Sequence, residues 1–174
     1  MEIIKRSQLN EALKTQNYRM ICEEVRQKRT APLDMTYDIF LCHSTDDHEE
    51  IRALKAFYEN QGKRAYVAEI DDPGISSNGI NKHTARTLQN RMMHSEELYY
   101  ILSKNSQDST WMPWEVGFFD GKKSGIKIKV VPIVDEHDYE ILDFPGHEYL
   151  ELYSKDGTTI QSLRLNRAID IARS

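Results

Sequence analysis

The sequence predicts a single α/β domain, a three-layer sandwich whose central parallel sheet has about five strands. Short apolar runs alternate with amphipathic helical segments along most of the chain, which is typical of βαβ units. Polar turn residues follow the apolar runs, as at the carboxyl ends of parallel strands. With 174 residues, 39% of them hydrophobic, the chain can fill one core but not two.

An N-terminal helix is expected before the sheet begins. Apolar side chains recur there at helical spacing with charged residues between them: Leu9, Leu13, Tyr18, Ile21, Cys22 and Val25. Pro32 lies in a short segment that breaks this pattern. We therefore expect residues 1–34 to form a helix and linker, and residues 35–174 to form the α/β domain.

The next segments predict strand, helix, strand and turn in that order. Residues 37–42 (YDIFLC) are an apolar run of strand formers, as expected of a buried parallel strand. Residues 44–47 have a helix-capping composition and precede a helix over residues 51–58. Residues 64–70 (RAYVAEI) predict the second strand, and residues 71–74 (DDPG) a turn.

The second half of the chain continues the alternation. Residues 75–81 are polar and contain glycine, so they predict a loop. We expect helices over residues 84–93, 114–121 and 160–171. We expect strands over residues 98–102, 126–134 and 149–153.

Composition argues against several classes of partner. Lys and Arg number 23 against 28 Asp and Glu, a net charge of -5, whereas nucleic-acid binders present basic patches. The basic runs at residues 26–29 and 122–129 are short and interrupted, so we interpret them as solvated surface. No stretch approaches the ~20 apolar residues that span a bilayer, and no signal peptide is evident. The two cysteines suit a reducing compartment, and we expect a cytoplasmic protein with neither nucleic-acid nor membrane partners.

Ligands of open parallel sheets bind beyond the carboxyl ends of the strands, so the residues there are the first candidates. The chain contains no Gly-x-Gly-x-x-Gly, P-loop or Gly-x-Ser-x-Gly motif, which leaves dehydrogenase, kinase and esterase activities without support. His43, Asp46, Asp47 and His48 could suggest a metal, but their spacing matches no zinc pattern. We therefore expect no metal site.

Three segments together resemble the TIR (Toll/interleukin-1 receptor) domain family. Residues 37–47 (YDIFLCHSTDD) resemble its first strand and acidic loop, and residues 72–74 lie where the family has its variable BB loop. Residues 99–105, followed by residues 109–115 (STWMPWE), resemble its third strand and Trp-x-x-x-Glu element. The resemblance covers about residues 36–134, and it implies a flavodoxin-like three-layer fold.

The resemblance also implies an activity. TIR domains include enzymes and adaptors, and the enzymes carry a carboxylate four residues after the tryptophan, where Glu115 stands. Such members cleave NAD into nicotinamide and ADP-ribose or a cyclic isomer, so NAD would be a substrate and no cofactor is expected. Residues 111–121 are similar to standalone bacterial members that produce signals in Thoeris-type anti-phage defence. A separate effector protein would then sense the product.

A single carboxylate suits this chemistry. The nicotinamide of NAD is a cation that departs neutral, so the difficult species is the oxocarbenium-like ribose, as in glycoside hydrolysis. A carboxylate beside the sugar stabilises that charge, which makes Glu115 the predicted catalytic residue. The alternative is a surface glutamate that favours the dipole of its helix.

The remaining candidates are expected to contact the substrate. Trp111 is assigned to stacking on nicotinamide or adenine, although core packing, which we expect for Trp114, is the commoner fate of tryptophan. The other predicted contacts are His43, Ser44, Asp47 and Asp71. For Asp47 the alternative is a helix cap. Asp71 is preferred to Glu69 for binding ribose hydroxyls, although Ala68 replaces an aspartate that often ends this strand in the family.

Two other functions remain open at this level. The domain could signal only by assembling with other TIR domains, without catalysis. It could also be a nucleoside deoxyribosyltransferase-like enzyme, a group with a related fold and a carboxylate at a glycosidic carbon. For the NAD-cleaving function, the resemblance implies self-association, because the loop at residues 72–80 often completes a neighbouring subunit's site.

Overall fold

The computed structural model describes residues 3–27, 29–75, 81–123, 127–134 and 148–153. Five strands form one sheet in which every hydrogen-bonded pair is parallel. Their order is β1-β5-β4-β2-β3, where the strands span Ile4–Lys5 (β1), Tyr37–Cys42 (β2), Ala65–Tyr66 (β3), Ser95–Leu102 (β4) and Ile128–Val134 (β5). The predicted class, an α/β sandwich with about five parallel strands, is confirmed.

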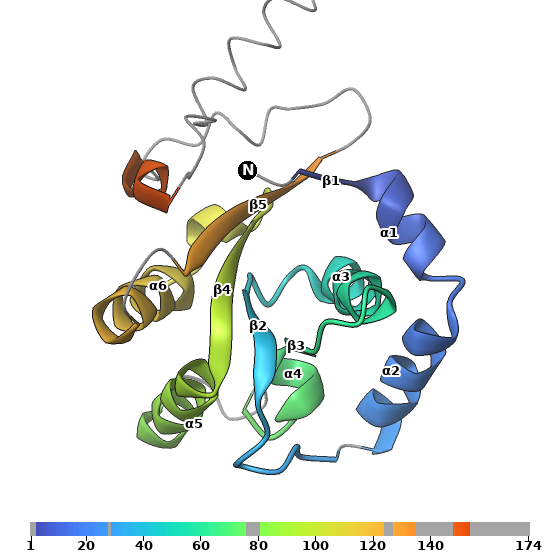
Figure 1. Ribbon diagram of the computed structural model, residues 1–174, viewed down its shortest axis with the longest axis horizontal. Helices are drawn as coiled ribbons and strands as arrows, with labels where there is room; N and C mark the ends of the chain where they lie inside the picture. The colour runs from blue at the N-terminus through green and yellow to red at the C-terminus, as the bar shows by residue number, and fades with distance from the viewer. Residues whose placement is uncertain (1–2, 28, 76–80, 124–126, 135–147, 154–174) are drawn as a thin grey trace, which may run out of the picture.

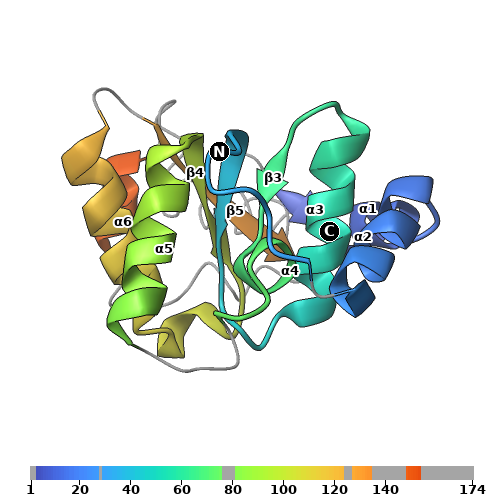
Figure 2. The same ribbon diagram turned by 90° about the horizontal axis from the view of Figure 1, so that it is seen from below.

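Helices cover both faces of the sheet (Figures 1 and 2). One face packs against α5 (Lys82–Met93) and α6 (Trp111–Lys122), and the other against α3 (His48–Asn60). Two N-terminal helices, α1 (Arg6–Ala12) and α2 (Gln16–Gln27), pack on α3. None of the helices in the described ranges combines the length and apolar character needed to cross a membrane.

Burial on both faces explains the continuous apolar runs. In β4, Tyr99 and Ile101 belong to the core on the α3 side, whereas Leu98, Tyr100 and Leu102 belong to the core beneath α5 and α6. Alternate residues of a strand point to opposite faces, so a strand covered on both sides must be apolar at every position.

The N-terminal segment differs from the single helix expected. Thr15 separates α1 from α2: its hydroxyl donates to the Ala12 carbonyl oxygen (2.6 Å) and accepts from the Tyr18 backbone N–H (3.3 Å). Before α1, Ile4 and Lys5 pair with β5 as an edge strand. Two residues carry no periodicity, which is why the sequence pattern did not reveal this strand.

The fifth strand predicted at residues 149–153 is wrong, because that segment is part of a 3-10 helix, η3 (Glu148–Tyr153), and β1 is the fifth strand. The strand predicted at residues 64–70 is also shorter than expected. β3 is followed by one helical turn, α4 (Ala68–Asp71), in which the Asp71 carboxylate accepts from the Val67 N–H (2.8 Å). The helix predicted at residues 160–171 and most of the loop at residues 75–81 lie outside the described residues.

Candidate functional site

A cavity of about 390 Å³ lies at the carboxyl ends of the strands. It is bounded by the loop after β2, by α4 and α5, and by the segment from η1 (Ser106–Asp108) to the start of α6. Of the six residues predicted for the site, four line this cavity: His43, Ser44, Trp111 and Glu115. The two that do not are Asp47 and Asp71.

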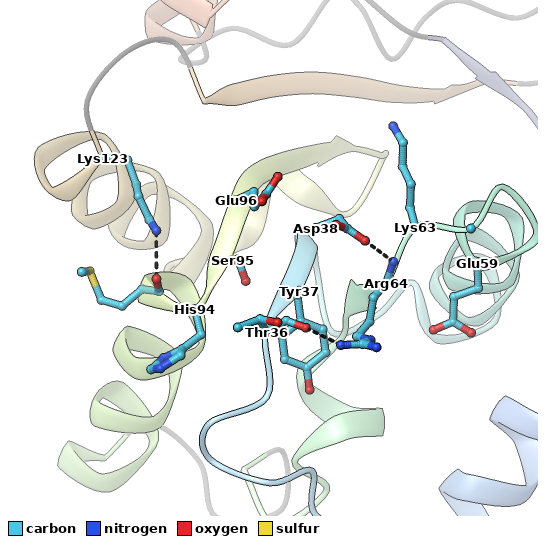
Figure 3. Close-up of a pocket in the computed structure, with 12 residues that line it drawn as sticks. Thr36, Tyr37, Asp38, Glu59, Lys63, Arg64, His94, Ser95, Glu96 and Lys123 are labelled. Atoms are coloured by element: carbon cyan, nitrogen blue, oxygen red, sulfur yellow. Dashed lines mark hydrogen bonds between the residues drawn. The ribbon is translucent and has the colours of Figure 1, made fainter.

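A larger groove of about 730 Å³ lies at the opposite, amino-terminal edge of the sheet (Figure 3). Several of its polar groups are already bonded within the protein. The Arg64 backbone N–H donates to the Asp38 carboxylate (2.6 Å), the Arg64 guanidinium to the Thr36 carbonyl oxygen (3.1 Å), and the Lys123 ammonium to the Met93 carbonyl oxygen (2.9 Å). None of the predicted site residues lines this groove. We therefore place the candidate site in the smaller cavity, although the groove is larger.

Glu115 is buried in the cavity wall, with 7% of its surface exposed. It lies on the inward face of α6, so the alternative of a solvated surface glutamate does not hold. Burial raises the pKa of Glu115 to about 7, against the opposing effects of a hydrogen bond with Cys42 and the positive charge of His43. The carboxyl group therefore changes its charge near neutral pH, as groups in active sites often do.

Cys42 ends β2 directly beneath this carboxyl group. Its thiol is hydrogen-bonded to Glu115 and lies 3.7 Å from the Met112 carbonyl oxygen. Burial and the neighbouring carboxylate raise the pKa of the thiol well above its usual range, so it stays protonated and can donate. The sequence predicted only a small buried hydrophobe here, because the partner of Cys42 is 73 positions away along the chain.

His43 is held by hydrogen bonds from both ring nitrogens. Nδ1 lies 2.8 Å from the Leu41 carbonyl oxygen and Nε2 lies 2.9 Å from Oε2 of Glu69. Both partners are acceptors, so both nitrogens must carry protons and the ring is an imidazolium. Burial lowers the pKa of His43, but the Glu69 carboxylate outweighs it and raises the pKa to about 9.

Glu69 is the cavity residue that sequence reasoning passed over in favour of Asp71. An extended strand would turn the two side chains to the same face, but the helical turn of α4 separates them. Glu69 lines the cavity, while Asp71 is buried against Lys55, whose ammonium lies 3.2 Å from its carboxylate. The sequence could have shown which of the two acids lines the cavity only if this one helical turn had been predicted.

Asp47 holds two loops together outside the cavity lining. Its carboxylate accepts hydrogen bonds from the Ser103 hydroxyl and from the Asn105 side-chain amide (2.6 Å). It stands at the start of α3 without capping it through its side chain. Asp47 thus fastens the loop after β2 to the loop after β4, and both loops border the cavity.

The two tryptophans lie on α6 with their rings in edge-to-face contact, 5.2 Å between centroids. Trp111 is half-buried and lines the cavity, so part of its ring is available to a ligand. Trp114 stacks on Phe118 at 5.9 Å and packs against the core. Ser44 is buried at the rim, where its hydroxyl accepts from the Asp46 N–H (3.4 Å).

Comparison with known proteins gives one strong similarity. Over 128 residues, the chain is 40% identical to the probable 3' cyclic ADP-D-ribose synthase ThsB' of Bacillus cereus (strain MSX-D12). The aligned region is 72% of this chain and 64% of that relative, so the chain spans less than two thirds of the relative's length. No protein-family model matches the chain.

Among solved structures, the TIR domain of the Toll-related receptor TRR-2 from the lower metazoan Hydra magnipapillata is 18% identical, with a TM-score of 0.47. The match covers 79% of this chain and 97% of that one.

The parallel α/β sandwich, with a buried carboxyl group at the carboxyl ends of its strands, agrees with the TIR-like fold that the sequence motifs predicted. The sequence similarity to a probable cyclic ADP-ribose synthase agrees with the resemblance of its motifs to bacterial TIR domains of the Thoeris type.

Proposed function

We propose that this domain cleaves NAD at the nicotinamide–ribose bond and releases nicotinamide together with ADP-ribose or a cyclic isomer. The observation that carries the proposal is the buried Glu115 carboxyl group in the cavity at the strand ends. The Bacillus cereus relative carries the name of a cyclic ADP-ribose synthase, which supports this substrate and product class. The product would act as a signal in anti-phage defence.

Bond cleavage needs little beyond electrostatics. Nicotinamide leaves as a neutral molecule, so no general acid is required. Positive charge develops on the ribose, and an ionised Glu115, itself almost buried, stabilises it. Water then attacks the ribose to give ADP-ribose, or a group of the substrate itself attacks to close a ring.

The other cavity residues supply substrate contacts in this proposal. The exposed part of the Trp111 ring offers a stacking surface for a nicotinamide or adenine base. The Ser44 hydroxyl offers a polar contact at the rim. Asp47 and Asp71 support the site through the loops they anchor. NAD is consumed as a substrate, so the reaction calls for no resident cofactor.

Incubation with NAD, followed by chromatography of nicotinamide and mass spectrometry of the products, tests this function. Wild-type protein should release nicotinamide, and Glu115→Gln should be slower by on the order of 10²–10³-fold, because the amide keeps the volume but not the charge. Glu23→Gln, an exposed substitution on α2, is the matched control and should retain wild-type activity. Equal turnover by the wild-type and Glu115→Gln proteins would refute the catalytic role.

Two further outcomes separate the alternative functions. A non-catalytic adaptor would release nothing from NAD at any protein concentration. A deoxyribosyltransferase-like enzyme would cleave nucleosides in preference to NAD.

For the NAD-cleaving function we propose self-association through the TIR domain, in which case specific activity rises with protein concentration. Strictly proportional turnover over a wide concentration range would contradict assembly-dependent activity.

A further inference from the structure

The His43–Glu69 ion pair lies inside the candidate site, yet the proposed reaction assigns it no task. Both side chains are almost buried, with 5% and 12% of their surfaces exposed. Burying two charges is costly unless they are paired and hydrogen-bonded. Here the imidazolium is fixed from both sides, by the Leu41 carbonyl oxygen and by Glu69. A rigid positive charge is thus built into the cavity wall.

The charges that face Glu115 are otherwise acidic or neutral. The segment at the end of β2 contributes the Cys42 thiol, His43 and Asp46. Glu69 comes from α4 and Asp108 from η1, while the lining residues of α5 are uncharged. Within the described cavity lining, His43 is the one cation. Beside the hydrogen bond with the Cys42 thiol, it is therefore the charge in that lining that offsets the cost of a negative charge on Glu115.

We propose that His43 is a positioning residue that, fixed as an imidazolium by Glu69, keeps the Glu115 carboxylate ionised for the reaction. This inference rests on the proposed NAD cleavage. His43 acts through its charge and need not touch the substrate, since both ring nitrogens are already engaged. The pair persists between about pH 2 and about pH 9. Burial raises the pKa of Glu69, but His43, helped by a backbone hydrogen bond and by His48 of α3 at 3.8 Å, outweighs burial and lowers it to about 2, while the pKa of His43 is about 9.

The two partners predict different effects when they are removed. His43→Gln removes the cation but leaves the negative charge of Glu69 near Glu115, so Glu115 should hold its proton to a higher pH. In Glu69→Gln, the buried imidazole loses the carboxylate that keeps it charged, so both charges disappear together. Its effect on Glu115 should therefore have the same direction and a smaller size.

The double variant His43→Gln/Glu69→Gln also contains neither charge. It should match Glu69→Gln and should recover part of the activity that His43→Gln alone loses. A purely structural role predicts the reverse, because two packing defects in one contact do not restore each other's activity. Rescue by a second substitution is thus the signature of the electrostatic role.

The experiment is the pH dependence of kcat/KM for NAD between pH 5.5 and 8.5, below the pKa of His43. The midpoint of the acid limb should lie at the lowest pH for wild type, at a higher pH for Glu69→Gln and the double variant, and at the highest pH for His43→Gln. A shift of one pKa unit corresponds to about a tenfold loss where the limb is steep, with recovery at high pH. His83→Gln, an exposed substitution on α5, should leave the profile unchanged. A uniform loss at every pH, or a double variant below His43→Gln, would overturn the proposal.

A second measurement separates this inference from NAD cleavage itself. Titration of the Glu115 carboxyl carbon by NMR in wild type and His43→Gln requires no turnover. A higher titration midpoint in His43→Gln supports the electrostatic role even if wild type releases no nicotinamide, whereas an unchanged midpoint refutes it. If His43→Gln does not fold, Glu69→Gln against wild type provides the same test.

Discussion

At the scale of single residues, Glu115 illustrates the conflict between stability and chemistry. Its carboxyl group is buried, and burial raises the pKa to about 7 from an ordinary value of 4.5. The unfolded chain releases this proton at lower pH than the folded protein does. The free energy of unfolding contributed by Glu115 therefore decreases as pH rises from about 4.5 to 7, and stays reduced above that range.

Glu115→Gln should consequently stabilise the protein at neutral and alkaline pH. The amide has no charge to bury, so the gain over wild type should approach on the order of 3 kcal/mol at pH 8 and vanish near pH 4. Urea unfolding of both proteins at the two pH values measures this difference. Glu23→Gln should show no comparable pH-dependent gain. Equal stability of wild type and Glu115→Gln at pH 8 would mean that the ionised carboxylate is not destabilising where it lies.

At the scale of elements, α5 depends for its start on Asn81, the N-cap residue that precedes it. The Asn81 side chain accepts hydrogen bonds from the His83 N–H (2.9 Å) and the Thr84 N–H (3.0 Å), two of the amides that helix geometry leaves unpaired. Asn81→Ala should lower the free energy of unfolding by about 1 kcal/mol. Asn81→Asp, which keeps an acceptor, should retain wild-type stability. Thermal and urea unfolding test both, and an unaffected alanine variant would contradict the capping role.

The helices and strands also show which elements sequence patterns predict and which they do not. Long apolar runs predicted β2, β4 and β5, because strands buried on both faces must be apolar throughout. The two-residue strand β1 gave no such signal. The run over residues 64–70 predicted the second strand but not that β3 ends at Tyr66, because the turn of α4 arises from contacts of Asp71 with the Val67 N–H and with Lys55. A local motif placed Glu115 and Trp111, whereas the partners Cys42 and Glu69 come from distant elements. Only the fold could bring them together.

At the scale of the whole molecule, Arg91 joins three parts of the chain. It is fully buried on α5, and its guanidinium donates to both oxygens of Asp72, at 2.7 and 2.9 Å. It also donates to the carbonyl oxygens of Ala31 and Pro32, in the segment between α2 and β2. The Tyr66 hydroxyl of β3 donates to Asp72 as well (3.0 Å). This network fixes the chain that enters the sheet to the loop that leaves α4.

Arg91→Met should therefore lower the free energy of unfolding by about 3–5 kcal/mol, because it leaves the charged Asp72 and two carbonyl oxygens without their hydrogen-bond donor. Asp72→Asn should also destabilise the protein, since it leaves the buried guanidinium without its counter-charge. The double variant Arg91→Met/Asp72→Asn should lose less than the sum of the two single losses, because neither partner is then left charged and alone. Urea unfolding of all four proteins gives the coupling directly. Strictly additive losses would mean that Arg91 and Asp72 contribute independently, and that the entry to the sheet and the loop after α4 are held by other contacts.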